Sequence, residues 1–458
     1  MLQDALYILR SLRRQPGFFA VAICTLTLGI ASTTAVFSLF YQILLRTLPV
    51  PAPRELVVFH ADNHDLPGGA SSDNAETVFS YPMYRRLRDG APHWQGIASR
   101  SSLTAQLSAS GTAERAQVEV VSGNFFETLR MKAFAGRLLS TSDDAVRGAS
   151  PVVVLSHGLF MRRFGAKNDV IGAKITLNGQ PFDVIGVAPE RFHGVLGGDS
   201  PDVYIPISMR HALNQDRDID RPSSRWLTIL GRLPENTTPQ AAQAAIRPLF
   251  SSIVADHVQE LKVTNPNARK RLESSQLVLN PAASGLNELK RQWEESLVVL
   301  LGMVGLLLLI ACANLANLLL ARGVNRAREI AVRVSLGATR GQILQLLLSE
   351  TIVITVLGAA LGAALAPALV DLLVRGISED GGSGWVTAEL SWPVLLFSTA
   401  LACVSTLLAG LAPAWQISRP AAGNLSGRSP ASAHARSRKF FVSAQVALSL
   451  VLLAVAGL

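Results

Sequence analysis

The residues best suited to a specific task lie in one basic stretch, ARGVNRAREIAVRVSLGATRGQILQLLLSE, at positions 321–350. Within it, REIAVRVSLGA alternates arginine with apolar residues before a glycine ends the turn. Such a segment is typical of a helix that lies along a membrane surface and presents one face to another protein. A plain basic loop would account for the arginines, but it would not need an ordered helix of this length or the glutamate inside it. We therefore expect a docking surface for a partner protein.

Glu350 closes this stretch and is a second candidate for chemistry. It stands directly before a long apolar run, and an ionisable side chain at membrane depth is often functional. Alternatively, its carboxylate lies at the level of the lipid headgroups, against an arginine such as Arg340. We favour this second interpretation, in which the role of Glu350 is structural.

Histidine and acidic side chains cluster in the segment HADNHD, which holds His60, Asp62, His64 and Asp65. These side chains can ligate metals, but we expect a solvated loop here, without a regular element to hold a ligand geometry. His157, in LSHGLF, lacks a recognisable nucleophile and acid arrangement, and a structural role at a helix start is expected. We therefore expect no metal site and no catalytic residues.

Nucleotide and nucleic-acid binding are not indicated. The Gly-Ala-Lys triplets at 165–167 and 172–174 lack the glycine spacing and the Ser/Thr of a phosphate-binding loop. We expect no cofactor in this chain, so any ATP hydrolysis comes from a partner. The net charge of +9 does not indicate nucleic acid, because the arginines cluster beside apolar runs. No zinc-finger or aromatic RNA-binding motif accompanies them.

The composition indicates that a membrane protein positions these residues. Of 458 residues, 49% are hydrophobic and 16% are charged, whereas soluble domains carry about 25% charged residues. Uncharged runs of sufficient length can each cross about 30 Å of hydrocarbon at about 1.5 Å per helical residue. Such runs are Gln15–Leu45, Ser296–Ala321, Thr351–Val370 and Leu390–Ser418. A further run, Phe440–Leu458, is uncharged to its last residue, and we expect the chain to be cut short there.

Arginines precede the first run, separate the second from the third and follow the fourth, which places these three segments in the cytosol. The segments between the first and second runs and between the third and fourth then lie outside. We expect an interfacial helix at 1–16, membrane helices at 17–46, 295–321, 341–374 and 393–417, an outer domain at 47–290, a cytosolic coupling segment at 322–340, an outer loop at 375–392, a cytosolic linker at 418–439 and the start of a further membrane helix at 440–458.

The outer segment has the pattern of a mixed α/β domain. DVIGAKITLNGQPFDVIGVAPE predicts two alternating strands about the turn Asn178–Gly179. SPVVVLSHGLFMRRFG predicts a buried strand, Val152–Leu155, and then a short amphipathic helix. Thr238, followed by Pro239 and apolar residues at helical spacing, predicts a helix packed on the sheet. The expected fold class is an α-helical membrane protein of four transmembrane helices and the start of a fifth, with a large extracytoplasmic α/β domain between the first two.

Small residues predict close helix packing in the third run. GAALGAALA places Gly358, Gly362 and Ala366 on one helical face, where two backbones can approach closely. Packing within one subunit and a seam between two subunits both remain open. In the first run, threonines and serines such as Thr25, Thr33, Thr34 and Ser38 could line a helix interface.

Several motifs resemble a known family. NLLLARGVNRAREIAVRVSLGATRGQILQLLLSE, with GLAPAWQISRP after the fourth run, resembles the permease core of the MacB and FtsX families of ABC transporters. RQPGFFAVAICTLTLGIASTTAVFSL and GQPFDVIGVAPERF are similar to the MacB-like members. The resemblance implies a multi-pass protein of the bacterial inner membrane, in the lipid bilayer, that forms a dimer or a pseudo-dimer with a second permease half. It also implies an ATP-binding ABC subunit and a periplasmic adaptor as partners.

Carried onto this sequence, the resemblance implies that contacts to the ATPase lie within the cytosolic segment, at Arg326, Arg328, Glu329, Arg333, Leu336 and Gly337. MacB carries a nucleotide-binding domain ahead of its first span, whereas this chain begins shortly before that span. It is more similar to the stand-alone, duplicated permeases. Apolar positions that recur at one constant offset between the stretches from Phe18 and from Phe440 are compatible with such a duplication.

The expected function is a permease that couples ATP hydrolysis by a partner to a conformational change of the outer domain, for export or efflux of a substrate. One alternative within the superfamily is an FtsX-like regulator of periplasmic cell-wall hydrolases. A second alternative, from another class, is a membrane sensor or adhesion protein that works without an ATPase.

Overall fold

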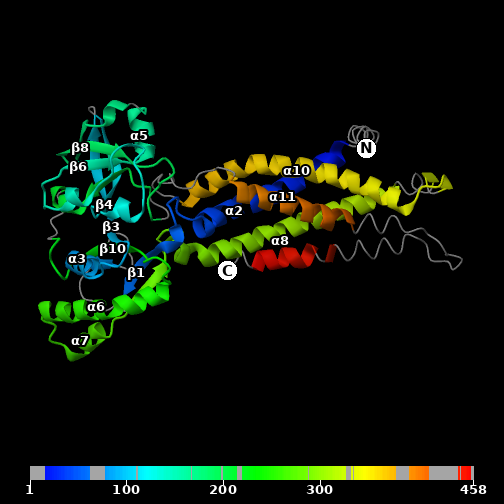
Figure 1. The fold of residues 1–458 in the computed structure, drawn as a ribbon. Helices are drawn as coiled ribbons and strands as arrows, with labels where there is room; N and C mark the ends of the chain where they lie inside the picture. Colours follow the sequence, from blue (N-terminus) through cyan, green and yellow to red (C-terminus); the bar gives the residue numbers. More distant parts are fainter. Residues whose placement is uncertain are drawn as a thin grey trace. The chain divides into compact units, whose positions relative to one another are not determined.

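The computed structural model describes residues 16–61, 78–109, 112–166, 168–196, 200–213, 219–286, 288–325, 332–333, 335–377, 391–411, 442–443 and 445–454 (Figure 1). The chain divides into two compact units. The helical unit is drawn from the chain up to Leu44 and from Gln292 onwards, and the outer domain is Leu45–Arg291. The predicted class, membrane helices with a large α/β domain inserted after the first, is confirmed.

The helical unit is built from long apolar helices. They are α2 (Pro16–Phe40), α8 (Glu288–Asn325), α10 (Arg340–Ile377) and α11 (Trp392–Thr406). Among the described residues, 4 stretches are long and apolar enough to cross a membrane: Pro16–Leu45, Glu295–Arg322, Gly341–Val374 and Trp392–Gly410. A shorter apolar helix at Gln445–Ala454 lies where the sequence predicts the start of a further span.

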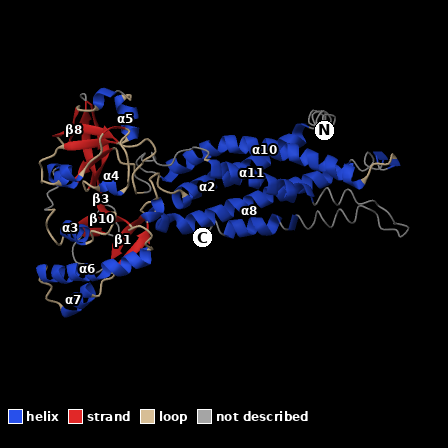
Figure 2. Cartoon of the chain, viewed as in Figure 1, coloured by secondary structure: helices blue, strands red, loops and turns tan. Residues whose placement is uncertain are grey.

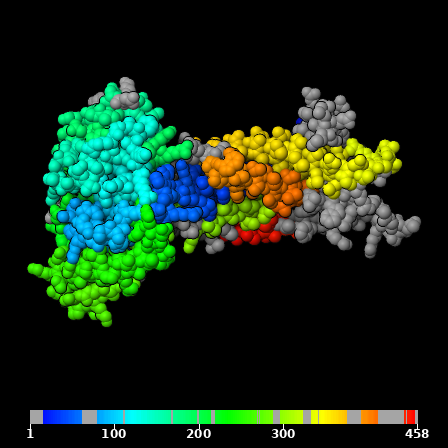
Figure 3. Space-filling model, in the orientation of Figure 1, coloured from blue at the N-terminus to red at the C-terminus, as the bar shows by residue number. Residues whose placement is uncertain are grey.

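Helix α2 is the centre of this unit. Of its apolar membrane-spanning stretch, 61% is buried, against 28% of that of each of the other three spanning helices. The Thr33 hydroxyl lies 3.3 Å from the Val304 carbonyl of α8, and the Thr34 hydroxyl lies 3.0 Å from that of Ser398 on α11. These contacts confirm that the two threonines line helix interfaces. Helices α10 and α11 lie side by side on the face shown in Figure 3.

The small residues of α10 face α2 of the same chain. A Cβ atom added at Gly358 would lie 3.0 Å from Leu26 Cβ, and one added at Gly362 would lie 3.1 Å from Ile30 Cγ2. Ala366, one turn further on, is 2% exposed. The two glycines therefore let α2 and α10 approach at backbone distance within one subunit.

The outer domain is organised around an 11-stranded sheet among the described residues, in the order β11-β1-β10-β3-β4-β9-β6-β8-β5 (Figure 2). Off this path, β2 pairs with β10, and β7 pairs with β3 and β8. The strands are β1 (Leu56–Ala61), β2 (Val78–Ser80), β3 (Gly96–Ala109), β4 (Thr112–Val121), β5 (Ala135–Gly136), β6 (Val152–Leu155), β7 (Lys174–Leu177), β8 (Gln180–Val187), β9 (Val203–Pro206), β10 (Arg225–Arg232) and β11 (Leu277–Pro281).

Helices cover this sheet and turns connect its strands. The α-helices are α3 (Tyr81–Gly90), α4 (Phe125–Thr128), α5 (His157–Phe164), α6 (Pro239–Glu260) and α7 (Pro266–Glu273). Short 3-10 helices lie at Pro53–Glu55, Thr141–Asp144, Asn168–Val170 and Ile207–Leu213. One core cluster packs α3 and α6 on the sheet, and a second holds Phe126, Phe192 and Tyr204 in mutual ring contact.

Local signals predicted several of these elements. Strand β6 begins and ends as predicted. The β7–β8 hairpin turns at Asn178 and Gly179, whose φ angles of 48° and 84° are those of a type I′ turn. Helix α6 begins after Thr238, whose hydroxyl accepts a hydrogen bond from the Ala241 amide at 3.3 Å. The predictions for these three segments are confirmed.

The first and last strands of the outer domain are neighbours in the sheet. Strand β1 follows its first residues and β11 precedes its last ones, and the two pair antiparallel from Val57 opposite Pro281 to Ala61 opposite Leu277. The Leu48 amide donates to the Ala283 carbonyl at 2.8 Å. The two ends of the domain are therefore fastened to each other.

The expectation of a solvated loop at HADNHD is wrong for His60. This residue belongs to β1 and pairs with Val278 of β11. The continuous apolar run Leu56–Phe59 extends the strand into the histidine. Asp62, His64 and Asp65 lie outside the described residues. The same holds for residues 1–15 of the interfacial helix predicted at 1–16, for most of the outer loop and for the whole cytosolic linker.

Candidate functional site

The connection between α8 and α10 carries the predicted docking residues. Arg326, Arg328 and Glu329 lie outside the described residues, whereas Arg333, Leu336 and Gly337 lie within them. The Leu336 amide donates to the Val332 carbonyl at 3.1 Å, which closes one helical turn. Val332 is 55% exposed and Leu336 is 82% exposed. Because residues four apart share one helix face, this turn presents an apolar pair outward.

A glycine ends this turn. Gly337 has a φ of 92°, and the Ala338 amide donates back to the Arg333 carbonyl at 3.0 Å. A left-handed glycine spanned by such a bond is the Schellman type of helix end. A Cβ atom at Gly337 would have nothing within 4 Å, so the requirement for glycine is conformational and not steric.

The next helix begins immediately afterwards. The Thr339 amide donates to Gln342 Oε1 at 2.9 Å, and the Gln342 amide donates to Thr339 Oγ1 at 3.4 Å. This reciprocal pair is a capping box at the start of α10. A helix end and a helix start thus follow each other within a few residues. The sequence LGATRGQ therefore fixes the direction of α10 relative to the preceding helical turn at residues 332–337, the docking turn.

Glu350 lies in the first half of α10 and is 2% exposed. Its Oε2 atom lies 3.2 Å from Nη1 of Arg322, near the end of α8, which is 9% exposed. The sequence favours an arginine such as Arg340 at headgroup level, whereas the structure pairs the buried Glu350 with Arg322. The difference arises because two antiparallel helices bring residues 28 positions apart to one depth.

Two aromatic rings complete this cluster. The guanidinium carbon of Arg322 lies 4.9 Å from the ring centroid of Phe18 and 5.0 Å from that of Phe19, both at the start of α2. These are cation–π distances. Sequence reasoning missed both rings and the role of Arg322. One signal was available, because Arg322 and Glu350 are opposite charges that border two successive apolar runs.

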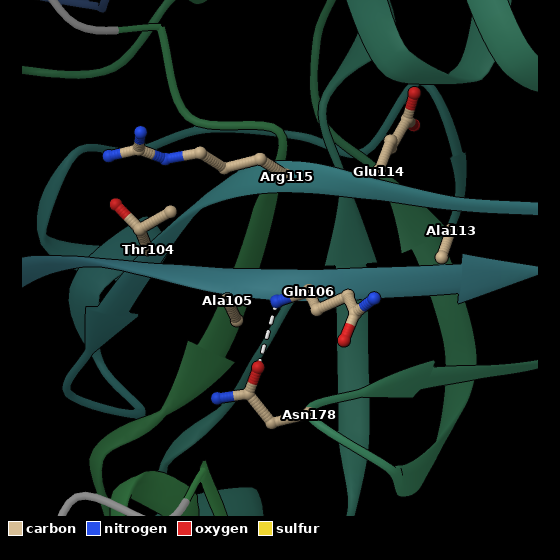
Figure 4. A pocket seen from close by; sticks show the side chains of 7 residues that line it. All are labelled: Thr104, Ala105, Gln106, Ala113, Glu114, Arg115 and Asn178. Carbon is tan, nitrogen blue, oxygen red and sulfur yellow. Dashed lines mark hydrogen bonds between the residues drawn. The ribbon is translucent and has the colours of Figure 1, made fainter.

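A shallow hollow lies on the outer domain (Figure 4). It measures about 360 Å³ and is lined by Thr104, Ala105, Gln106, Ala113, Glu114, Arg115 and Asn178. The β3–β4 hairpin forms its floor, and Asn178 Oδ1 accepts a hydrogen bond from the Gln106 amide at 2.8 Å. Glu114 is held by Arg163 at 2.6 Å. Most of these seven residues are polar, so their arrangement supports polar contact with a ligand or a partner.

Buried charges in the outer domain have structural partners. Arg100 of β3 and Glu119 of β4 are 0% and 2% exposed and form a bidentate ion pair. His257 of α6 is 2% exposed, and burial lowers the pKa of its imidazole to about 4, with Arg225 adding to the effect. His157, at the first turn of α5, packs edge-on against the Phe134 ring at a centroid distance of 4.8 Å.

The fold and the connection define a multi-span membrane protein with an inserted outer domain and an ordered turn between its second and third long helices. Residues 19–249 match the MacB-like periplasmic core domain, and residues 301–422 match the FtsX-like permease C-terminal domain. The chain belongs to the family of MacB-like and FtsX-like ABC transporter permeases, which confirms the resemblance seen in the sequence.

Curated relatives support this assignment. The chain is 27% identical over 333 residues to the uncharacterized ABC transporter permease YknZ of Bacillus subtilis, covering 71% of this chain and 72% of YknZ. It is 26% identical over 254 residues to the macrolide export ATP-binding/permease protein MacB of Hahella chejuensis, covering 55% of this chain and 35% of that protein. The chain thus spans about a third of the length of this fused relative.

Two solved structures align with about half of this chain. The periplasmic region of MacB from Actinobacillus actinomycetemcomitans aligns with a TM-score of 0.36 at 17% identity, covering 54% of this chain and 94% of that one. The extracellular domain of YknZ, described as a noncanonic ABC-type transporter from Gram-positive bacteria, aligns with a TM-score of 0.33 at 12% identity, covering 49% and 99%.

Proposed function

We propose that this chain is the permease subunit of a MacB/FtsX-like exporter of the bacterial inner membrane whose ATPase is a separate polypeptide. The observation that carries the proposal is the outward-facing pair Val332 and Leu336 on a turn whose direction Gly337 fixes. An exposed apolar pair in a stretch of sequence that is rich in arginine suits a protein partner better than a lipid headgroup layer. Relatives whose names combine ATP-binding and permease functions support an ABC ATPase as that partner.

The docking segment (residues 326–337) would follow the ATPase as it closes on ATP. The movement would reach the outer domain through α2 and α8, the helices that precede and follow that domain in the chain. The substrate would be handled outside the membrane, without a hydrophilic tunnel. Support comes from Thr33 and Thr34, whose hydroxyls are engaged in helix contacts. A second permease half and a periplasmic adaptor complete the proposed assembly.

Co-purification with an ABC ATPase encoded beside this chain tests the proposal. We expect the wild-type chain to retain the ATPase, and the Leu336→Ser variant and the Arg328→Ala, Arg333→Ala double variant to lose it by about tenfold or more. Leu336 is 82% exposed, so its replacement should leave the fold intact. Met161→Ser, at a 50% exposed apolar residue of the outer domain, is the matched control. Equal retention by all variants would show that docking does not use this segment.

A further inference from the structure

Arg322 links three helices of the helical unit. It belongs to α8, its ion-pair partner Glu350 belongs to α10, and the rings of Phe18 and Phe19 belong to α2. Arg322 is also the last residue of the apolar span Glu295–Arg322. The docking segment follows directly after α8 in the chain. The cluster therefore lies where the docking segment meets the membrane helices.

The chemistry of a guanidinium suits this position. Its N–H edge can donate to a carboxylate while its flat face lies against aromatic rings. A lysine ammonium is a point charge without a flat face, so it orients these partners less strictly. Because both charges are buried, separating them would leave an uncompensated charge in an apolar setting. Helices α2, α8 and α10 are therefore expected to shift together at this end.

The other end of the docking segment is also fixed. Gly337 and the capping box at Thr339 set the angle between the docking turn and α10. Contacts among the described residues therefore fix the chain before the docking segment, at Arg322, and at its end, at Gly337. Helix α2 is far from this segment in the sequence, and the contacts of its two rings with Arg322 connect it to the end of α8.

We propose that Arg322 is the joint that makes α2 follow the docking segment, by holding Glu350 of α10 and the rings of Phe18 and Phe19 of α2 at once. The inference rests on the proposed function, since it needs an ATPase that moves the segment. Arg322 acts here as a positioning residue. It contacts neither ATP nor the transported substrate in this scheme.

Natural cysteines allow a direct test in the full chain with its ATPase. Cys24 on α2 is exposed, Cys312 is buried and Cys403 is exposed. In a Cys403→Ser background, an environment-sensitive maleimide on Cys24 reports on α2. A second reporter, Ser335→Cys in a background that also lacks Cys24, reports on the docking turn. Both signals are compared between the ADP-bound and ATP-bound complexes, after removal of unbound ATPase.

Three variants weaken the joint in different ways. Arg322→Lys keeps the charge, Glu350→Gln keeps the shape, and Phe18→Leu with Phe19→Leu keeps the ion pair. In each, we expect the ATPase to co-purify and the docking-turn signal to persist, while the ATP-dependent α2 signal falls about tenfold. Phe18→Tyr, which keeps a ring, should retain the α2 signal. Phe37→Leu, which removes a ring stacked on Phe397 at 3.8 Å elsewhere on α2, is the matched control and should also retain it.

The outcomes separate the two claims. If the wild-type chain binds no ATPase, the proposed function is overturned and the joint is overturned with it. If the ATPase binds and all three variants keep the full α2 signal, the joint alone is overturned. A merely structural role would lower the thermal stability and weaken both reporters equally, in Phe37→Leu as much as in the joint variants, and that result would also overturn the inference.

Discussion

Gly362 of α10 lies against Ile30 of α2 so closely that an added Cβ atom would come within 3.1 Å of Ile30 Cγ2 and 3.2 Å of the Ala31 amide nitrogen. We expect Gly362→Leu to force these helices apart and to cost on the order of 2–3 kcal/mol, as overpacking does in cores. Thermal unfolding of the detergent-purified chain measures this. Gly302→Leu is the control, because nothing lies within 4 Å of a Cβ there in this chain. Equal effects of the two substitutions would contradict the tight contact.

The left-handed backbone of Gly337 makes a second prediction. At a φ of 92° an alanine is strained, so Gly337→Ala should destabilise the helix end at this residue by about 1–2 kcal/mol. Faster hydrogen exchange of the amides of Ala338 and Gln342 would report the loss. Gly341→Ala lies inside α10, where nothing is within 4 Å of a Cβ, and should be neutral or slightly stabilising. Slower or unchanged exchange in Gly337→Ala would argue against a fixed helix end at this residue.

The buried pair Arg100 and Glu119 predicts strong coupling between β3 and β4. Removing only the acid by Glu119→Leu leaves a buried guanidinium uncompensated and should cost about 3–5 kcal/mol. Replacing both, by Arg100→Met with Glu119→Leu, should recover most of that loss. Denaturant unfolding followed by tryptophan fluorescence, with Arg100→Met alone as the second single variant, gives the double-mutant cycle. A double variant that is no more stable than Glu119→Leu would show that the pair is not coupled as the geometry indicates.

His257 predicts a pH dependence of the outer domain. Its folded pKa of about 4 lies below the ordinary value of 6.5, so the folded state keeps the imidazole neutral. The unfolded chain binds the extra proton first as the pH falls, and the stability is therefore complete above about pH 6.5 and decreases down to about pH 4. The loss should be on the order of 3 kcal/mol.

Substitution at His257 isolates this effect. In His257→Leu the slope of stability against pH between 6.5 and 4 should become shallower than in the wild-type chain, whereas His93→Leu, at an exposed histidine, should leave it unchanged. Hydrogen exchange of α6 at several pH values measures the slope. An unchanged slope in His257→Leu would mean that other groups set the acid sensitivity.

Local patterns predicted the elements, and long-range pairing did not follow from them. The residues Val152–Leu155 and the Asn-Gly turn at 178–179 carry their conformations in their own side chains and backbone preferences. The sheet order places β10 between β1 and β3, which no local signal indicates, because partners far apart in sequence are chosen by packing. The class of protein followed from apolar runs alone, since membrane helices need only length and hydropathy.

The candidate site divides in the same way. The glycine that ends the docking turn follows from the local sequence pattern, whereas Leu336 was expected only from the resemblance to the family. The partner of Glu350 depends on the relative depth and rotation of α8 and α10, which a single sequence does not encode visibly. The contact of Arg322 with the rings of Phe18 and Phe19 depends additionally on the placement of α2, more than 300 positions away in the chain.

The antiparallel pairing of β1 with β11, with the hydrogen bond from Leu48 to Ala283, makes the outer domain a self-closed insert. A segment whose two ends are already tied together can be exchanged for another of unrelated sequence while the host helices keep their register. Recombination at the paired ends of this domain would let the same set of membrane helices carry a different outer domain, in a single genetic event.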